Sequence, residues 1–194
     1  MNKVSELKNL LEQNKKKEKI KKEKVDVKWI ITIVIIAFII SFGLSFVANS
    51  TIPNLSLIFG IIITLLFIFI GILFDIVGVA VTTADEAVFH SMNSRKVKGA
   101  NVAVKFKKNA DKTSSFCCDV IGDICGVISG AAGTTICAIL VSKYHTDLLL
   151  TGLVITAIIS SLTIGGKAIG KSFAINKSDI ILYEFAKIVS NFYK

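Results

Sequence analysis

FCCDVIGDICGVISGAAGTTICAILV, residues 116–141, is the stretch of sequence that decides the fold. It is apolar and long enough to span a bilayer core of about 30 Å, yet Asp119 and Asp123 stand near its start. An ionised side chain within hydrocarbon costs at least about 2.5–3.5 kcal/mol. The stretch therefore predicts a membrane-spanning helix, and it raises the question of what the two carboxylates face.

The same stretch carries a ridge of glycines. Gly122, Gly126 and Gly130 recur every fourth residue, so they stack on one face of a helix. A face without side chains lets a second helix approach closely, as in the packing of small residues between membrane helices. The ridge predicts helix packing, either against another helix of the same chain or against a second copy in a homodimer.

Composition places the whole chain in a membrane. Of its 194 residues 53% are hydrophobic, the mean hydropathy is +0.68 and the net charge is +9. These values indicate an integral membrane protein rather than a soluble globule. The polar N-terminal lead is too long for a secretory signal peptide. Anionic lipid headgroups match the basic segments more economically than nucleic acid, so we expect the lipid bilayer as partner and no nucleic acid.

The pattern along the chain predicts an all-α polytopic membrane protein with four transmembrane helices. Amphipathic juxtamembrane helices are expected between the second and the third, where apolar residues recur at helical spacing within a lysine-rich segment. The predicted spans cover residues 29–49, 55–83, 116–141 and 148–170. The predicted units are a basic N-terminal tail at 1–28, an extra transmembrane helix with its external link at 29–54, a transmembrane domain at 55–179 and an amphipathic tail at 180–194.

The basic residues predict the orientation. Residues 1–28 hold ten lysines, residues 84–115 hold seven Lys or Arg, and five lie from Lys167 onward. The two remaining links hold none and one, Lys143. Because basic loops stay on the cytoplasmic side, we expect a multi-pass protein of the cell membrane with both termini in the cytoplasm.

The ionisable residues in the spans have more than one interpretation. The Asp75 side chain is hydrated at the inner interface if its helix begins near residue 55. It lies within the membrane if that helix tilts or begins later. Asp119 suits an interfacial cap at the positive end of a helix dipole, whereas Asp123 lies a turn deeper. Lys167 follows two glycines and is interpreted as a lysine that snorkels from a flexible helix end.

Other reactive residues give no sign of catalysis. His90 stands alone and is interpreted as a polar interfacial residue. The spacing of the cysteines is not that of a zinc site, so they are interpreted as small buried apolar residues. No sequence motif of a hydrolase triad, phosphate loop or haem site is present, and we expect no enzymatic activity. The cysteines are Cys117, Cys118, Cys125 and Cys137.

From Thr82 onward several features follow one another in a recognisable order. They are VTTADEAVFHS at a span end, a basic connector, Ile-Gly-Asp at 121–123, Gly-Gly-Lys at 165–167 and AINKSD at 174–179. This order resembles the transmembrane domain of the CorB/CorC and cyclin M family, which is implicated in magnesium and cobalt transport or efflux. The resemblance covers roughly residues 55–179. It implies three spans that enclose juxtamembrane helices, a homodimer, and a magnesium ion bound within the membrane.

The sequence departs from the family pattern at its polar positions. The family's acid-x-Ala pattern is met by Asp85 or Glu86 before Ala87. Its Gly-Asn is Gly122-Asp123 here. The last span has Thr163 at the place of a family glutamate and Gly166 at the place of a proline.

These departures suggest a changed ion site. Loss of the glutamate removes one ligand, and Asp123 restores a negative charge in the same region. Mg²⁺ typically takes one or two carboxylates plus waters. The resemblance therefore implies a divalent-cation site for Mg²⁺ or Co²⁺. Its expected ligands are Asp123, the hydroxyls of Thr82, Thr83 and Thr163, and the carboxylates of Asp119 and Asp75.

An alternative function is open. A dead ion site would leave a non-transporting membrane scaffold or regulatory module that packs through its glycine ridge. The family's CBS and CorC-type cytoplasmic domains do not follow in this sequence, so we expect no nucleotide-linked gating.

Overall fold

The computed structural model describes residues 27–51 and 56–192, and every regular element within them is a helix. Four helical stretches in these residues are long and apolar enough to cross a membrane: Val27–Ala48, Leu57–Thr83, Ala110–Tyr144 and Leu148–Asn176. The prediction of an all-α polytopic membrane protein is confirmed.

The first of these stretches belongs to α2 (Val27–Thr51), which extends the predicted span by two residues at each end. α2 is apolar on all sides, as expected of a helix surrounded by lipid or protein. Within α2 the Thr32 hydroxyl donates a hydrogen bond to the Lys28 carbonyl oxygen at 2.8 Å. The basic tail predicted at 1–28 lies, apart from its last two residues, outside the described residues, and so does most of the link predicted after α2.

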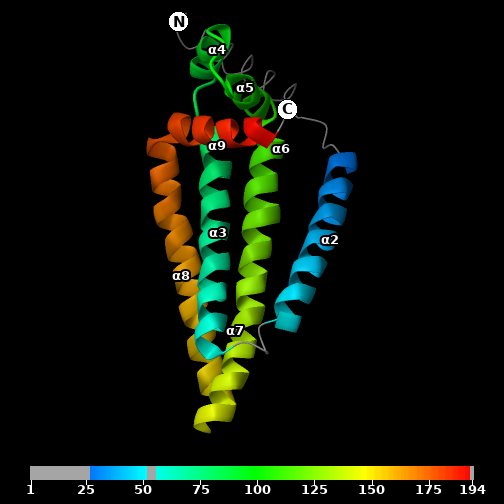
Figure 1. The fold of residues 1–194 in the computed structure, drawn as a ribbon, viewed down its shortest axis with the longest axis vertical. Coiled ribbons are helices and arrows are strands. Elements are labelled where there is room, and N and C mark those ends of the chain that lie inside the picture. Colours follow the sequence, from blue (N-terminus) through cyan, green and yellow to red (C-terminus); the bar gives the residue numbers. More distant parts are fainter. Residues whose placement is uncertain (1–26, 52–55, 193–194) are drawn as a thin grey trace, which may run out of the picture. The chain divides into compact units, whose positions relative to one another are not determined.

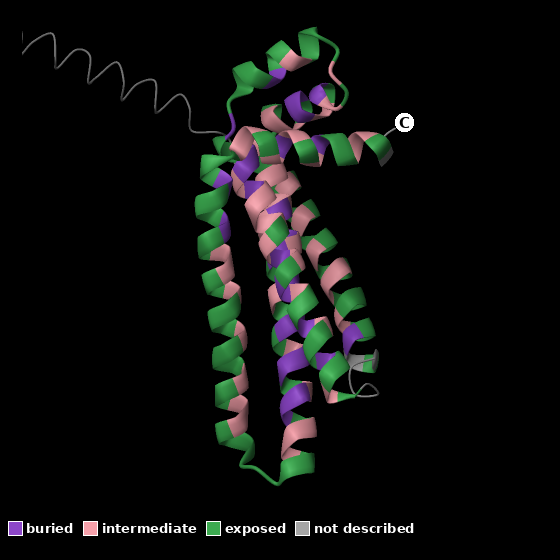
Figure 2. Cartoon of the chain, turned by 60° about the vertical axis from the view of Figure 1, so that its left-hand side comes forward, coloured by how far each residue is buried: buried purple, intermediate pink, exposed green. Residues whose placement is uncertain are grey.

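Three long helices, α3 (Leu57–Thr83), α7 (Asp123–Tyr144) and α8 (Leu148–Asn176), run alongside one another and pack pairwise (Figure 1). We call the end where residues 145–147 join α7 to α8 the link end, and the opposite end the cap end. Figure 2 shows buried positions along the inner helix faces and exposed ones on the outside. The exposed side chains are largely Ile, Leu, Val and Phe, which suits contact with lipid.

The third span begins earlier than predicted. α6 (Ala110–Ser115) continues through the π-helical segment η2 (Phe116–Gly122) into α7 without a break. Asp119 therefore lies inside a continuous helical run and not in its first turn. The interpretation of Asp119 as a dipole cap is wrong, because the helix dipole acts within the terminal turn only.

The fourth span is also longer than predicted. α8 continues past residue 170 to Asn176, with Gly165 and Gly166 in regular helix. The interpretation of these glycines as a loosened helix end is wrong, because the bundle packs around Gly166. A Cβ at Gly166 would meet the Ile72 side chain, and one at Gly170 would lie 2.7 Å from Ile76 Cγ1.

Short helices form a separate core at the cap end, where Figure 1 shows α9 lying across the ends of the long helices. α4 (Glu86–Ser94) and α5 (Ala100–Lys108) pack against each other, and α5 packs on α9 (Ser178–Phe192). We call this group of buried residues the cap core: Val81, Ala84, Phe89, Ala103, Val104, Leu182 and Ala186. The segment 180–194, expected to be a tail, is thus part of the folded domain through Phe192, because its apolar face completes this core.

Polar contacts tie the cap to the spans. The Lys107 ammonium donates to the carbonyl oxygens of Val81 (3.1 Å) and Thr82 (2.8 Å), which satisfies the end of α3 where carbonyls lack helical partners. The Asp179 carboxylate accepts from the Asp85 backbone N–H at 2.8 Å. The cap therefore fixes where α3 ends and where α9 begins.

Replacing Gly99 with alanine is expected to destabilise the cap. Gly99 has φ +87°, and a Cβ there would lie 2.9 Å from Lys187 Cα on α9. The left-handed backbone alone costs roughly 1–2 kcal/mol for a residue with a Cβ, and the contact adds to it. We expect a lower melting temperature of the purified protein. Gly165→Ala is the control, because Gly165 is helical and open; equal effects of the two changes would contradict this account.

Candidate functional site

One ammonium group joins two carboxylates from two other helices. Lys167 Nζ on α8 lies 3.0 Å from Asp123 Oδ1 on α7 and 3.6 Å from Asp75 Oδ1 on α3. The side chains of Lys167 and Asp75 are 25% and 17% exposed, and that of Asp123 is 65% exposed. We call these three residues the ionic cluster. With both carboxylates ionised it carries one uncompensated negative charge.

Small residues allow this approach. Gly166 and Gly170 flank Lys167 and bring the α8 backbone against Ile72 and Ile76 of α3. On the α7 side, a Cβ at Gly122 would lie 3.7 Å from Lys167 Nζ, an ordinary contact distance, so the ammonium lies against the Gly122 position. The glycines thus position the lysine between the two acids.

The three members of the cluster share one depth in the bundle. At 1.5 Å per residue, Asp75 lies about 27 Å from Leu57 at the start of α3, and Lys167 lies about 28 Å from Leu148 at the start of α8. Asp123 lies about 31 Å from Tyr144. A hydrocarbon layer of about 30 Å that begins at the link end therefore ends at the cluster. Of the two interpretations of Asp75, its depth fits the interface, although packing leaves its side chain largely shielded.

A groove lies between α7 and α8, on the link-end side of the cluster. It encloses about 190 Å³. The hydroxyl-bearing residues of α8 stand about one turn apart along it, and Lys167 follows one turn beyond the last of them. We call this the hydroxyl groove, and its lining residues are Gly126, Gly130, Thr156, Ile159, Ser160, Thr163 and Ile164.

The structure does not bring the predicted threonines together at Asp123. The hydroxyls of Thr82 and Thr83 both donate to the Val79 carbonyl oxygen, at 2.8 and 2.9 Å. They lie about 10 Å beyond Asp75 along α3. Thr163 lies one turn from Lys167, and its hydroxyl donates to the Ile159 carbonyl oxygen at 2.8 Å. The prediction that Thr82 and Thr83 lie beside Asp123 is thus wrong. Thr163 lies one turn of α8 from Lys167, at the groove.

Asp119, also expected at the ion site, lies four residues before Asp123 in η2, and its side chain is exposed. The π-helical geometry of η2 changes the direction of side chains along this stretch, and such segments often occur at functional sites. The ammonium of Lys167 pairs with Asp75 and Asp123, so the described cluster has two carboxylates and not three.

The glycine ridge divides between two environments. Gly122 packs within the chain, where a Cβ would lie 3.6 Å from the Gly71 carbonyl oxygen. Gly126 and Gly130 have no atom of the described residues within 4 Å of an added Cβ and line the hydroxyl groove instead. Within the described part of the chain, packing therefore accounts for Gly122 alone among the three.

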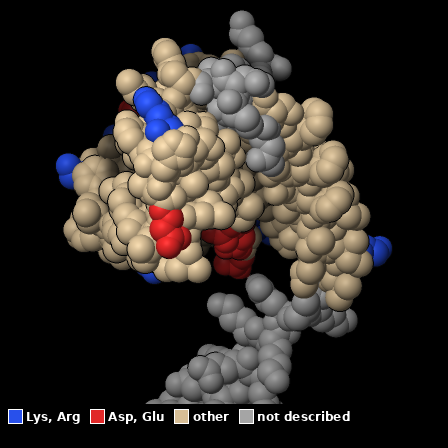
Figure 3. Space-filling view, turned by 90° about the horizontal axis from the view of Figure 1, so that it is seen from below, with Lys and Arg blue, Asp and Glu red and all other residues tan. Residues whose placement is uncertain are grey.

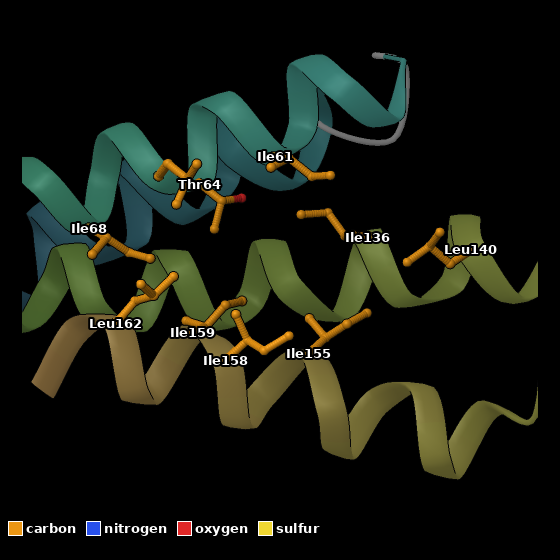
Figure 4. Close-up of a pocket in the computed structure, with 10 residues that line it drawn as sticks. Ile61, Thr64, Ile68, Ile136, Leu140, Ile155, Ile158, Ile159 and Leu162 are labelled. Atoms are coloured by element: carbon orange, nitrogen blue, oxygen red, sulfur yellow. The ribbon is translucent and has the colours of Figure 1, made fainter. Parts of the chain in front are cut away.

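A second cavity lies nearer the link end, and it is apolar. Figure 4 shows Ile and Leu side chains of α3, α7 and α8 around it. Its volume is about 200 Å³. Its one polar lining residue, Thr64, donates its hydroxyl to the Gly60 carbonyl oxygen at 2.8 Å. This cavity offers hydrocarbon contact and no ligand for an ion.

Charged residues are unevenly divided between the two ends. Figure 3 views the molecule from the link end and shows mainly uncharged side chains there. The lysines and arginine of the described connector lie on or beside the cap helices: Arg95, Lys96, Lys98, Lys105, Lys107, Lys108 and Lys112. A basic cap beside apolar spans suits anionic headgroups.

Cysteine and histidine offer no alternative centre in the described residues. All four cysteines are free; Cys117, Cys125 and Cys137 are buried and Cys118 is partly buried. His90 Nε2 lies 3.1 Å from Glu86 Oε1 on exposed α4. Within residues 27–51 and 56–192, no group of three or more His, Cys, Asp and Glu side chains is placed to hold a metal ion.

Two carboxylates are nevertheless a sufficient protein contribution for one kind of ion. Mg²⁺ commonly keeps several waters and takes one or two carboxylates from a protein. Asp75 and Asp123 meet that description, and the exposure of Asp123 leaves space for water. The oxygen donors of such a site are thus present on α3 and α7, with Lys167 Nζ beside both carboxylates.

Comparison of the chain with known protein families, with characterised proteins and with solved structures gives no match. The family resemblance therefore rests on the motif residues themselves.

Lys167 is the functional residue whose role sequence reasoning missed. It was interpreted as a snorkelling lysine, although a signal was present. Asp75, Asp123 and Lys167 lie 20, 18 and 19 residues from the link-end limits of their predicted spans, and this coincidence of depth indicates an ion pair between helices.

Proposed function

We propose that this protein is a cation-transporting membrane protein that acts on a divalent cation, in keeping with its resemblance to the CorB/CorC and cyclin M transmembrane domain. The observation that carries the proposal is the convergence of Asp75 and Asp123 on one ammonium, one turn of α8 beyond the last hydroxyl of the hydroxyl groove. Ionisable residues of transmembrane helices commonly pair with one another and mark ion pathways.

The groove supports a route as well as a site. Thr156, Ser160 and Thr163 lie about 12, 18 and 22 Å from the link-end start of α8. Their hydroxyls offer oxygen ligands at each turn, and hard cations prefer oxygen. A cation in the hydroxyl groove would pass from the hydroxyl oxygens, which carry partial negative charges, to the two carboxylates, which carry full ones.

The location follows from the charges of the cap. The protein is proposed to lie in the cell membrane with its basic cap and both termini in the cytoplasm, because basic loops are retained there. The cap lysines would then contact anionic lipid headgroups of the inner leaflet.

The test is Mg²⁺ flux into proteoliposomes, read with an internal indicator. Asp123→Asn is expected to lower the flux at least about tenfold, because the ion loses one of two carboxylate ligands. Asp119→Asn is the matched control, because it makes the same change four residues away on the same helix. The proposal is refuted if correctly inserted wild-type protein gives no more flux than empty vesicles, or if the two variants behave alike.

A second candidate is the non-transporting membrane module. Gly126 and Gly130 leave a small-residue surface uncovered, and such surfaces pack against other membrane helices. Lys167 would then serve only to balance the acids. Absence of flux, together with a stable complex in native membranes that Gly130→Leu disrupts, would favour this candidate.

A further inference from the structure

The ammonium of Lys167 stands where a substrate cation would have to bind. It is 3.0 Å from one carboxylate oxygen and 3.6 Å from the other. No second cation fits between Asp75 and Asp123 at ligand distance while the ammonium remains there, because like charges at that distance repel strongly.

We infer that Lys167 is a tethered competitor, which occupies the cation site at rest and is displaced when a divalent cation binds. This inference rests on the proposed function, and it adds how that site is controlled and what it selects. Lys167 is a specificity-determining residue, because a cation displaces it only if that cation interacts more strongly with the two carboxylates than the ammonium does.

Charge arithmetic sets the selectivity. The carboxylates contribute −2 and the ammonium +1, so the resting cluster carries −1. A monovalent ion that replaces the ammonium leaves the charge at −1 and gains nothing in neutralisation. A divalent ion brings the cluster to zero. The lysine thus disfavours monovalent ions in particular.

The position of Lys167 makes its displacement feasible. The residue lies about nine residues before the cap-end terminus of α8, at the depth where a hydrocarbon layer starting at the link end is complete. A lysine has a flexible four-carbon stem, and from this depth it is able to extend its ammonium toward the headgroup level. The Lys167 side chain is 25% exposed, so the ammonium has access to solvent from its resting position.

The experiment measures thermal stability of the purified full-length protein against Mg²⁺ concentration, and in parallel against Na⁺ at matched ionic strength. Lys167→Met is expected to lower the Mg²⁺ concentration for half-maximal stabilisation by about tenfold, equivalent to about 1.4 kcal/mol, and to add a response to Na⁺. Lys171→Met, one turn further along α8 and exposed, is the control and is expected to resemble the wild type.

A second variant works in the opposite direction and preserves the charge needed for folding. Lys167→Arg retains the positive charge and holds carboxylates through a planar fork of donors. It is expected to raise the Mg²⁺ concentration for half-maximal stabilisation. Adding Asp123→Asn to Lys167→Met is expected to remove the gain, which places the ion at the cluster.

The outcomes separate the inference from the proposed function. A wild-type response to Mg²⁺ that depends on Asp123 but does not change in Lys167→Met or Lys167→Arg overturns the inference and leaves the cation site standing. A response in Lys167→Met without flux in the wild type supports the inference and removes the transport proposal. No response to Mg²⁺ in any variant overturns both.

Discussion

Replacement of Gly78 with leucine is expected to prevent the bundle from folding into its native packing. A Cβ at Gly78 would contact Cys118 Sγ directly, and it would lie 3.1 Å from the Ser114 carbonyl oxygen and 3.3 Å from Cys117 Cβ. The obstacle includes backbone, so a rotamer change does not relieve it. Overpacking of this kind typically costs 1–3 kcal/mol or more, and leucine adds three further carbon atoms.

The measurement is the fraction of monodisperse protein after heating, followed by size-exclusion chromatography. Gly165→Leu is the control, because an added Cβ at Gly165 meets nothing within 4 Å. A milder pair tests the contact itself: Gly78→Ala is expected to lower the melting temperature, and adding Cys118→Ala is expected to recover part of the loss. If Gly78→Leu is as stable as Gly165→Leu, α3 and η2 do not pack as described.

The sequence predicted the spans well because their signal is local. A continuous apolar run of about 20 residues predicts a membrane-spanning helix whatever the rest of the chain does. α3, for example, begins within two residues of its expected start. Helix ends were harder to predict. α8 runs past Gly170 because that glycine packs on Ile76 of α3, and this contact is not visible in the sequence of α8.

Packing between helices explains the other differences. Gly122, Gly126 and Gly130 form a regular small-residue pattern, yet among the residues that the structure describes only Gly122 of the three has close neighbours from another helix. Periodicity defines a face of a helix but not the partner of that face. Likewise, the apolar face of α9 was evident, but its burial against α5 depends on tertiary contacts.

The candidate site was predicted in part. Asp75 and Asp123 were identified because charge within an apolar run is rare. Thr82 and Thr83 came from the resemblance, and their hydroxyls are bonded to their own helix. Sequence distance along one helix gives depth, whereas rotation about the helix axis decides what a side chain faces, and rotation depends on the packed partners.

Reversing the charge of Lys167 is expected to have the second large effect. Lys167→Glu would place a third carboxylate beside Asp75 and Asp123, with no cation left in the cluster. Removing one partner of a buried ion pair costs about 3–5 kcal/mol; the loss here is smaller because Asp123 is 65% exposed, and the repulsion of a third carboxylate adds to it. We expect little folded protein after extraction, whereas Lys171→Glu, an exposed change of the same kind, is expected to be tolerated.

Exchanging the charges tests whether the pairing itself is responsible. Asp75→Lys alone would place two ammonium groups beside Asp123 and is also expected to destabilise the bundle. The double variant Asp75→Lys with Lys167→Glu restores two carboxylates and one ammonium in the same space, so it is expected to be more stable than either single variant. The coupling free energy from this double-mutant cycle measures the contact between α3 and α8. A double variant no more stable than the worse single change would show that these two side chains do not interact.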